Sequence, residues 1–177
     1  YIQNKAIIEQ ICLENLIDWQ PIFYTKKPPI LSTIWDIIKL NKKVKKLHQQ
    51  KQFKLIHCRS YITSLIGLAF KQKYRVKFIF DMRGLWADER VDGNLWNLNN
   101  PIFKLIFNYF KKKEKAFIEH ADKIISLTKN AKKEMLTWNI SNLTSNKIIV
   151  IPCTADYKLF ELVNNEKRKI AKQNLDL

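Results

Sequence analysis

The alternation of short apolar runs with amphipathic segments, which begins near residue 53, constrains the fold of this chain more than any other feature. The runs are rich in Ile, Val, Phe and Leu, and the segments between them repeat apolar side chains at helical spacing. Such an alternation predicts a parallel sheet covered by helices on both faces. The sequence therefore predicts an α/β domain with a Rossmann-like, doubly wound parallel sheet. Its strands are expected at 53–58, 76–81, 122–128 and 146–152, and its helices at 60–73, 101–121 and 129–139.

The part of the chain before residue 53 is less regular. Apolar positions in 5–17 and in 31–50 follow helical spacing, and Ser32 or Thr33 is expected to cap the second of these helices. Between them, residues 22–24 predict a short strand that the following Pro pair ends. The chain after the last predicted strand is polar and is expected to be helical.

Polar side chains follow the carboxyl ends of the predicted strands, where open α/β sheets bind their ligands. They are Arg59 after the first strand, Asp81, Arg83 and Gly84 after the second, and Thr128 after the third. The connection 83–100 leaves the same edge and is far longer than a usual strand-to-helix loop. Guanidinium groups placed here could clamp a phosphate or a carboxylate. The sequence therefore predicts one ligand-binding crevice at this edge.

The acidic residues of this region allow a second interpretation. Asp81, Asp88 and Glu89 could pair with Arg83 and Arg90 and stiffen the long connection without binding anything. Both interpretations can hold together.

The sequence lacks the usual nucleotide-binding motifs. It contains three Gly in all, and neither G-x-G-x-x-G nor G-x-x-x-x-G-K-[ST] occurs. An ordinary NAD- or ATP-binding Rossmann domain is therefore disfavoured. His57 lies in an apolar strand and fits a hydrogen-bonded core residue better than a catalyst. His120 lies near a helix C-terminus, where it favours the helix dipole, and no chemistry is assigned to it.

The net charge of +16, from 32 basic and 16 acidic residues, favours a polyanionic partner. Abundant Lys, Ile and Asn are also what an A+T-rich genome produces, so part of the charge could be compositional. The basic segments 39–51 and 110–117 suggest docking on an anionic membrane, and an ordinary solvated helix face is the alternative.

Other features predict a cytoplasmic protein, and the basic segments suggest a place at the inner face of the cell membrane. No apolar run is long enough to span a bilayer, and no signal peptide opens the sequence. Three Cys without C-x-x-C spacing argue against a disulfide framework and against a structural zinc site, so no metal is expected. The chain begins with Tyr1 and is expected to be a piece of a longer polypeptide.

Four segments, in this order and at this spacing, resemble the N-terminal, acceptor-side half of a bacterial family-4 glycosyltransferase with the GT-B fold. They are LIHCRSY at 55–61, FIFDMRGLWADER at 78–90, KAFIEHADKIISLT at 115–128 and IIVIPCTADYKLF at 148–160. In that family the last strand of the first domain runs into a hinge that crosses to the second domain. Pro152, Asp156 and Phe160 keep the hinge pattern, whereas the stretch 153–155 lacks the family's Gly and suggests a stiffer or differently turned hinge.

The resemblance implies a two-domain enzyme of which this chain is one half. Residues 1–152 would form the Rossmann-like N-terminal domain, with its first strand cut off. Residues 153–177 would form the hinge and the start of the connection to a missing C-terminal domain that binds the donor. The fragment alone is therefore expected to be inactive. Its catalytic residues stay unknown, because Asp81–Gly84 stands where many members have a His-containing loop.

The resemblance also implies the reaction. The full-length enzyme would transfer a sugar from a nucleotide-sugar to a saccharide or lipid-linked acceptor, with retention of anomeric configuration, in surface-polysaccharide biosynthesis. It would need no metal and no cofactor. The expected acceptor-binding residues are Arg59, Asp81, Arg83, Gly84, Trp86, Glu89, Arg90 and Thr128, and the indole of Trp86 would offer a flat face to a sugar.

Two other classes of function remain open. The positive charge suits a nucleic-acid-binding domain, but the sequence has no RNP-like signature and no recognisable helix-turn-helix pattern, so nucleic acid is not the expected partner. A non-catalytic α/β domain that binds a protein partner is the other alternative.

Overall fold

A sheet of four parallel strands forms the centre of the structure, a computed structural model that describes residues 4–28, 30–155 and 165–174. The strands are β1 (Leu55–Arg59), β2 (Lys77–Met82), β3 (Lys123–Ser126) and β4 (Ile148–Val150), and they lie in the order β1-β2-β3-β4. The register places Arg59 beside Asp81, and Met82 beside Ser126, so the carboxyl ends of the strands meet at one edge. The predicted α/β class and the parallel, Rossmann-like sheet are confirmed.

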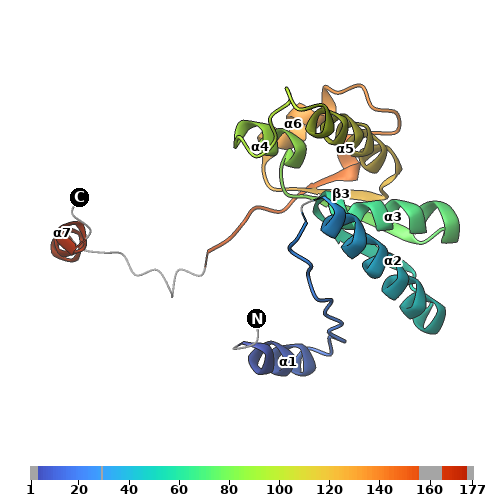
Figure 1. The fold of residues 1–177 in the computed structure, drawn as a ribbon, viewed down its shortest axis with the longest axis horizontal. Helices are drawn as coiled ribbons and strands as arrows, with labels where there is room; N and C mark the ends of the chain where they lie inside the picture. Colours follow the sequence, from blue (N-terminus) through green and yellow to red (C-terminus); the bar gives the residue numbers. More distant parts are fainter. Residues whose placement is uncertain (1–3, 29, 156–164, 175–177) are drawn as a thin grey trace.

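Helices connect the strands and extend the fold on either side in the sequence (Figure 1). They are α1 (Lys5–Glu14), α2 (Leu31–Lys51), α3 (Ser60–Tyr74), α4 (Trp86–Asp92), α5 (Pro101–His120), α6 (Lys129–Leu136) and α7 (Asn165–Asn174). α3 joins β1 to β2, α4 and α5 join β2 to β3, and α6 joins β3 to β4. Neither α1 nor α7 contains a buried residue. None of the helices in the described ranges is long and apolar enough to cross a membrane.

The connecting helices lie on one face of the sheet. Phe78 and Phe80 of β2 and Ile124 of β3 are fully buried on this face, which α3 and α5 contact. On the opposite face, Leu55 and Ile149 are 51% and 43% exposed. The strands follow one another in chain order, and right-handed crossovers in one direction put every connecting helix on the same side. Helices were expected on both faces of the sheet, but in the described residues the connecting helices cover one face only.

Aromatic rings fill the space between this face and the helices. Tyr61 of α3 lies edge-on to Phe80 of β2, with 5.7 Å between ring centroids, and Phe117 of α5 lies 5.3 Å from the same ring. Aromatic pairs in such tilted arrangements add to the gain from apolar burial. A smaller cluster, which includes Phe70 of α3 and Leu40 of α2, attaches α2 to α3.

Gly67 allows α3 to approach the sheet closely. A Cβ atom at this position would lie 2.5 Å from the ring of Phe78 and 2.6 Å from the Sγ of Cys58. Cys58 is buried in the same contact, and its burial raises the pKa of the thiol to about 12. The position therefore has no room for a larger residue.

The predicted strand at 22–24 does not form, and that prediction was wrong. In the described residues this segment pairs with no strand of the sheet. Side chains of α2 bond to the backbone here in place of a neighbouring strand. Lys43 and Lys39 donate hydrogen bonds to the carbonyl oxygens of Pro21 and Phe23, each at 3.1 Å.

Three further boundaries differ from the predictions. α2 begins at Leu31, so Ser32 and Thr33 lie inside its first turn, and no side chain caps it. The connection 83–100 is not an open loop, because it contains α4. A 3₁₀ turn, η1 (Ser145–Lys147), occupies the first part of the predicted fourth strand.

Candidate functional site

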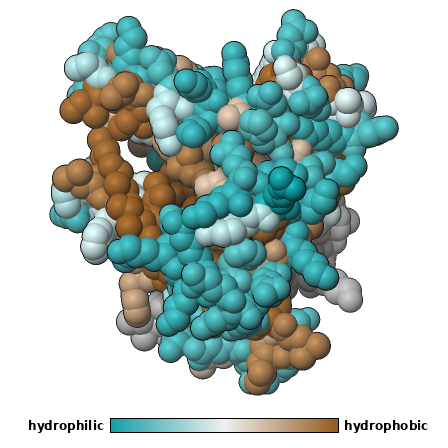
Figure 2. Space-filling model, turned by 90° about the vertical axis from the view of Figure 1, so that its right-hand side faces the viewer, coloured by the Kyte–Doolittle hydropathy of each residue, from teal (hydrophilic) through white to brown (hydrophobic). Residues whose placement is uncertain are grey.

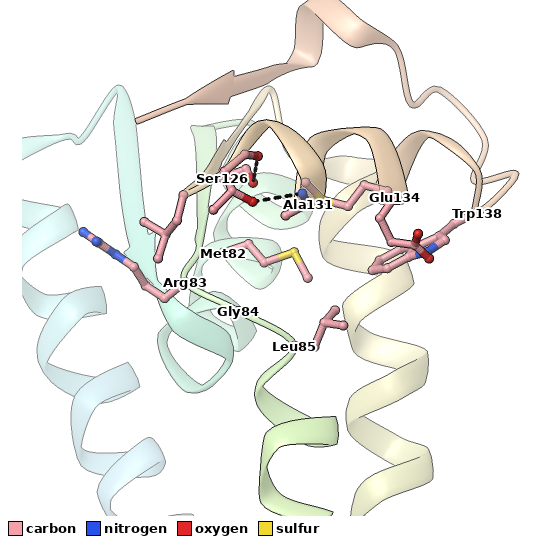
Figure 3. Close-up of a pocket in the computed structure, with 11 residues that line it drawn as sticks. Met82, Arg83, Gly84, Leu85, Ser126, Ala131, Glu134 and Trp138 are labelled. Atoms are coloured by element: carbon pink, nitrogen blue, oxygen red, sulfur yellow. Dashed lines mark hydrogen bonds between the residues drawn. The ribbon is translucent and has the colours of Figure 1, made fainter. Parts of the chain in front are cut away.

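A cavity of about 220 Å³ lies at the carboxyl edge of the sheet, between the ends of β2 and β3 and the first turns of α6. Most of its wall is apolar, with a few polar groups at defined positions, as in most small-molecule sites. The side chains in Figure 3 belong to its lining, which consists of Met82, Arg83, Gly84, Leu85, Ser126, Leu127, Thr128, Ala131, Glu134, Met135 and Trp138.

Thr128 stands at the start of α6 and shapes one wall of this cavity. Its backbone is extended, and its Oγ1 accepts a hydrogen bond from the backbone N–H of Ala131 at 3.0 Å, which caps the helix. The Oγ of Ser126 donates to the carbonyl oxygen of Thr128 at 3.2 Å (Figure 3). The bond from Ala131 holds Oγ1 of Thr128 in place, and a hydroxyl that accepts such a bond can still donate its own proton to a ligand.

Arg83 forms the opposite end of the cavity and is held by Asp81. The Nε of Arg83 lies 3.2 Å from Oδ1 of Asp81, whose side chain is only 3% exposed. In the described part of the chain neither of these two atoms makes a hydrogen bond. Figure 3 shows the guanidinium directed away from Trp138, along the edge of the sheet. Both atoms are shielded from solvent, but the side chain of Arg83 is 36% exposed, so its terminal guanidinium nitrogens could bind an anionic or hydroxyl-rich ligand.

His57 belongs to the same cluster, although it was predicted to be a hydrogen-bonded core residue. Its Nε2 lies 3.3 Å from Oδ2 of Asp81, and its side chain is 48% exposed on the face of the sheet that carries no helix. The expectation of a core histidine was therefore wrong. Alternation along β1 places His57 and Arg59 on the same face, beside Asp81.

Gly84 and Glu89 lie in contact at the start of α4. A Cβ atom at Gly84 would be 2.0 Å from Oε1 of Glu89, so the missing side chain makes room for this carboxylate. Glu89 itself does not line the cavity. Its predicted role in acceptor binding stays a prediction.

A partly buried charged network anchors α4. Lys111 of α5 donates to Oδ2 of Asp88 and to Oε1 of Glu114, both at 2.7 Å, and the hydroxyl of Tyr61 donates to the other carboxylate oxygen of Glu114. Burial and then the Glu114 carboxylate raise the pKa of Tyr61 far above its usual range. Burial lowers the pKa of Lys111, but the bonds to Asp88 and Glu114 outweigh this effect and raise it overall.

Ion pairs hold the long connection in place as predicted, but some of the partners differ from the predicted ones. Asp81 pairs with Arg83 as expected, whereas Asp88 pairs with Lys111 and not with an arginine. Arg90 lies 5.1 Å from the ring centre of Trp86, as a cation–π contact.

The structure does not bring all the predicted site residues together. Arg83, Gly84 and Thr128 line the cavity, and Asp81 holds Arg83 from behind. Trp86 and Arg90 line a different groove on the other side of α4. The indole of Trp86 packs against Tyr61 and Phe110, with centroid distances of 5.6 Å and 4.9 Å, so part of its surface is used within the fold.

The predicted hinge is only partly described. Pro152 directly follows the last residues of the sheet region, and Sγ of Cys153 lies 3.7 Å from a guanidinium nitrogen of Arg83. Asp156 and Phe160 lie outside the described residues.

Glu134 of α6 and Trp138, two residues past the end of this helix, complete the cavity and had not been predicted. The indole nitrogen of Trp138 donates to Oε1 of Glu134 at 3.2 Å. This pair places an aromatic face and a carboxylate opposite Arg83 (Figure 3). Their spacing of four residues in the predicted helix 129–139 was the available signal, since residues i and i+4 of a helix lie on the same side. In the ranges described, no three His, Cys, Asp or Glu side chains are grouped as a metal site would require.

Comparison with known proteins adds a family to this geometry. The model of Glycosyltransferase Family 4 matches residues 8–159. Among solved structures, the chain is similar to sucrose-phosphate synthase from Thermosynechococcus elongatus, with a TM-score of 0.59 and 20% identity. The match covers 90% of this chain and 36% of that one, so the chain spans about a third of that protein, and the likeness concerns the fold alone. No curated protein matches the chain.

Proposed function

The chain belongs to glycosyltransferase family 4, and we propose that it forms the acceptor-binding domain of an enzyme that transfers a sugar from a nucleotide-sugar to a saccharide or lipid-linked acceptor. The observation that carries this proposal is the cavity at the carboxyl edge of the sheet, which Arg83, Thr128 and the Glu134–Trp138 pair all line. Ligands of open α/β sheets bind at this edge.

Each side chain of the cavity has a role in this proposal. Arg83 binds a hydroxyl or an anionic group of the acceptor, and Asp81 holds the guanidinium in place. The hydroxyl of Thr128 donates a hydrogen bond to a sugar oxygen, and the indole of Trp138 packs against the apolar face of the ring. Arg59, at the same edge, would contact a part of the acceptor that extends from the cavity. Gly84 and Glu89 shape the approach, while Trp86 and Arg90 would contact an acceptor that reaches past α4.

The proposal assigns the donor to another domain. Residues 1–152 would form the acceptor domain, and 153–177 would begin the connection to a domain that binds the nucleotide-sugar. Transfer would retain the anomeric configuration, without a metal or a cofactor, and the chain described here would be inactive alone. The proposed setting is surface-polysaccharide biosynthesis in the bacterial cytoplasm.

A lipid-linked acceptor would require the enzyme to work at an anionic membrane. The two Lys-rich segments are weaker support for this than their sequence suggests, because several of their cations act inside the fold. Lys39 and Lys43 bond to carbonyl oxygens of the preceding segment, and Lys111 holds α4. A proposal of membrane contact therefore needs support from other features of the surface.

The variant Arg83→Ala in the full-length enzyme tests the acceptor assignment. Because a hydrogen bond to a charged group contributes about 1.5–3 kcal/mol, we expect the acceptor KM to rise about tenfold or more, with the donor KM unchanged. Initial rates with each substrate varied separately would measure both constants. Arg75→Ala, at the opposite edge of the sheet, is the matched control.

Folding must be checked, since Arg83→Ala leaves the carboxylate of Asp81 without its cation. The double variant Asp81→Asn/Arg83→Ala removes that unpaired charge and should show the same rise in acceptor KM. Wild-type acceptor kinetics in both folded variants would show that the cavity does not bind the acceptor.

A further inference from the structure

A second, larger groove lies between α2 and the pair α4 and α5, with a volume of about 880 Å³. Its wall is mostly aliphatic and aromatic and is formed by the first half of α2, by α4 and by the first half of α5. Its charged lining residues are Lys26 and Arg90, and no acidic residue lines it. The groove is therefore an apolar surface with cations only.

Several of the large apolar side chains in this groove remain open to solvent. Leu105 of α5 and Leu95 before it are 71% and 59% exposed, and Ile34 of α2 and Tyr109 of α5 are about half exposed. In the space-filling view, apolar side chains gather around a hollow on one side of the molecule (Figure 2). Contiguous apolar surface of this kind usually marks a binding surface.

The cations of the groove are held at its wall. Arg90 lies over the ring of Trp86, which itself lines the groove, and Lys104 precedes Leu105 on the exposed side of α5. A bilayer with anionic headgroups offers phosphates to these cations and acyl chains to the apolar wall, which a soluble acidic protein would not do. The excess of 32 basic over 16 acidic residues favours the same partner.

We propose that this groove is the surface by which the protein binds an anionic lipid bilayer, with Leu95, Leu105 and Tyr109 inserted below the headgroups and an acyl chain of a bilayer lipid in the groove. Lys26 and Arg90 contact lipid phosphates at its rim.

The position of the groove relates it to the acceptor cavity. α4 lies between the two, since Leu85 lines the cavity and the next residue, Trp86, lines the groove. A bilayer bound here would bring the carboxyl edge of the sheet to the membrane surface, where a lipid-linked acceptor is found. This part of the inference rests on the proposed function, whereas bilayer binding itself requires no transfer reaction.

Vesicle flotation tests the inference with the full-length protein and with the variant Leu105→Ser. The vesicles contain phosphatidylcholine either alone or mixed with phosphatidylglycerol. We expect the wild type to bind the mixed vesicles and to dissociate as salt is added. Because a leucine side chain is lost from the apolar contact, Leu105→Ser should bind the mixed vesicles at least about tenfold more weakly than the wild type. Leu13→Ser in α1 is the matched control, since Leu13 is also 71% exposed, and it should bind as the wild type does.

Other outcomes would overturn the inference. Equal binding of wild type and Leu105→Ser would place the lipid contact elsewhere, and a wild type that floats with neither vesicle would exclude a bilayer. If Leu13→Ser weakened vesicle binding as much as Leu105→Ser, the lipid contact would not be specific to the groove and would include α1. A dimer that Leu105→Ser converts to a monomer, without vesicle binding, would assign it to a second copy of the chain.

Transfer to a water-soluble saccharide separates this inference from the proposed function. Leu105 takes no part in the acceptor cavity, so Leu105→Ser should retain that activity. Loss of vesicle binding with this transfer intact supports the inference. Absence of wild-type transfer, together with specific vesicle binding, would contradict the proposed function alone.

Discussion

At the scale of single residues, buried ionic groups hold the segment after β2 in one conformation. The carboxylate of Glu114 is almost fully buried and is satisfied by Lys111 and by the hydroxyl of Tyr61. Lys111 also binds Asp88 on α4, so one ammonium group connects α4 to α5. Breaking such a buried pair is costly because it leaves a charge without a partner.

Replacement of Lys111 measures what this network contributes. Lys111→Met should lower the free energy of unfolding by about 3 kcal/mol, because the buried carboxylate of Glu114 loses its cation. Urea denaturation followed by circular dichroism is the measurement, and Lys112→Met, one residue further on the exposed side of α5, is the control. The double variant Lys111→Met/Glu114→Gln should recover part of the loss. Equal stability of Lys111→Met and the control would show that the network is not a stabilising element.

Asp122 gives the stability a dependence on pH. Burial alone would raise the pKa of its carboxyl, but the hydrogen bonds from Lys71 and from the backbone N–H of Phe78 outweigh burial and lower it below 3.8. A depressed pKa in the folded state adds stability above the unfolded pKa, and this contribution is lost as the pH falls through the folded pKa.

Asp122→Asn should therefore destabilise the protein at neutral pH by roughly 1.5–3 kcal/mol, the contribution expected of a hydrogen bond to a charged group. The difference from the wild type should shrink as the pH falls below about 4. Urea denaturation at a series of pH values would show this, with Asp92→Asn at the exposed end of α4 as the control. A difference that stays constant across this range would contradict the account.

At the scale of elements, hydrophobic spacing alone was sufficient to predict every strand of the sheet and the helices α3, α5 and α6 between them, but not α4. The failures occurred where the outcome depends on distant partners. The segment 22–24 has strand composition, but a strand requires a neighbour with free backbone groups, and here Lys39 of α2 donates to the carbonyl oxygen of Phe23 instead. α4 is short and lies among polar residues, and Lys111 of another helix stabilises it, so its own sequence carries little helical signal.

The packing of α3 on the sheet depends on a single glycine. Gly67→Ala should lower the free energy of unfolding by about 1–3 kcal/mol or more, because the added Cβ would overlap Phe78 and Cys58. Thermal unfolding is the measurement. Ala69→Leu adds more volume on the exposed side of the same helix and should change stability little. An unaltered melting temperature in Gly67→Ala would mean that α3 does not approach the sheet this closely.

At the scale of the whole molecule, the site could be predicted in part. Chain order along a parallel sheet was enough to place Arg83 and Thr128 at a common edge. It was not enough to find Glu134 and Trp138, because their place in the cavity depends on how α6 rotates when it packs against β3 and β4. The role of His57 was missed for a related reason. A histidine in a strand is buried only if its own face of the sheet is covered, and His57 lies on the face that none of the described helices covers.

The central claim is that the cavity between β2, β3 and α6 binds the acceptor of a sugar-transfer reaction. A variant that fills the cavity tests this claim without changing any charge. Ala131 lines the cavity and is exposed, so Ala131→Leu should place its side chain in the acceptor's space without disturbing the core. Ala131→Ser is the control, because it keeps the volume of the cavity nearly unchanged.

The most direct measurement is therefore the kinetics of transfer by the full-length enzyme that carries Ala131→Leu, with acceptor and donor varied separately. We expect kcat/KM for the acceptor to fall by about tenfold or more, the order expected from excluding a bound group, while the donor KM and the kinetics of the Ala131→Ser variant remain at wild-type values. Unchanged acceptor kinetics in a folded Ala131→Leu enzyme would contradict the claim that this cavity is the acceptor site.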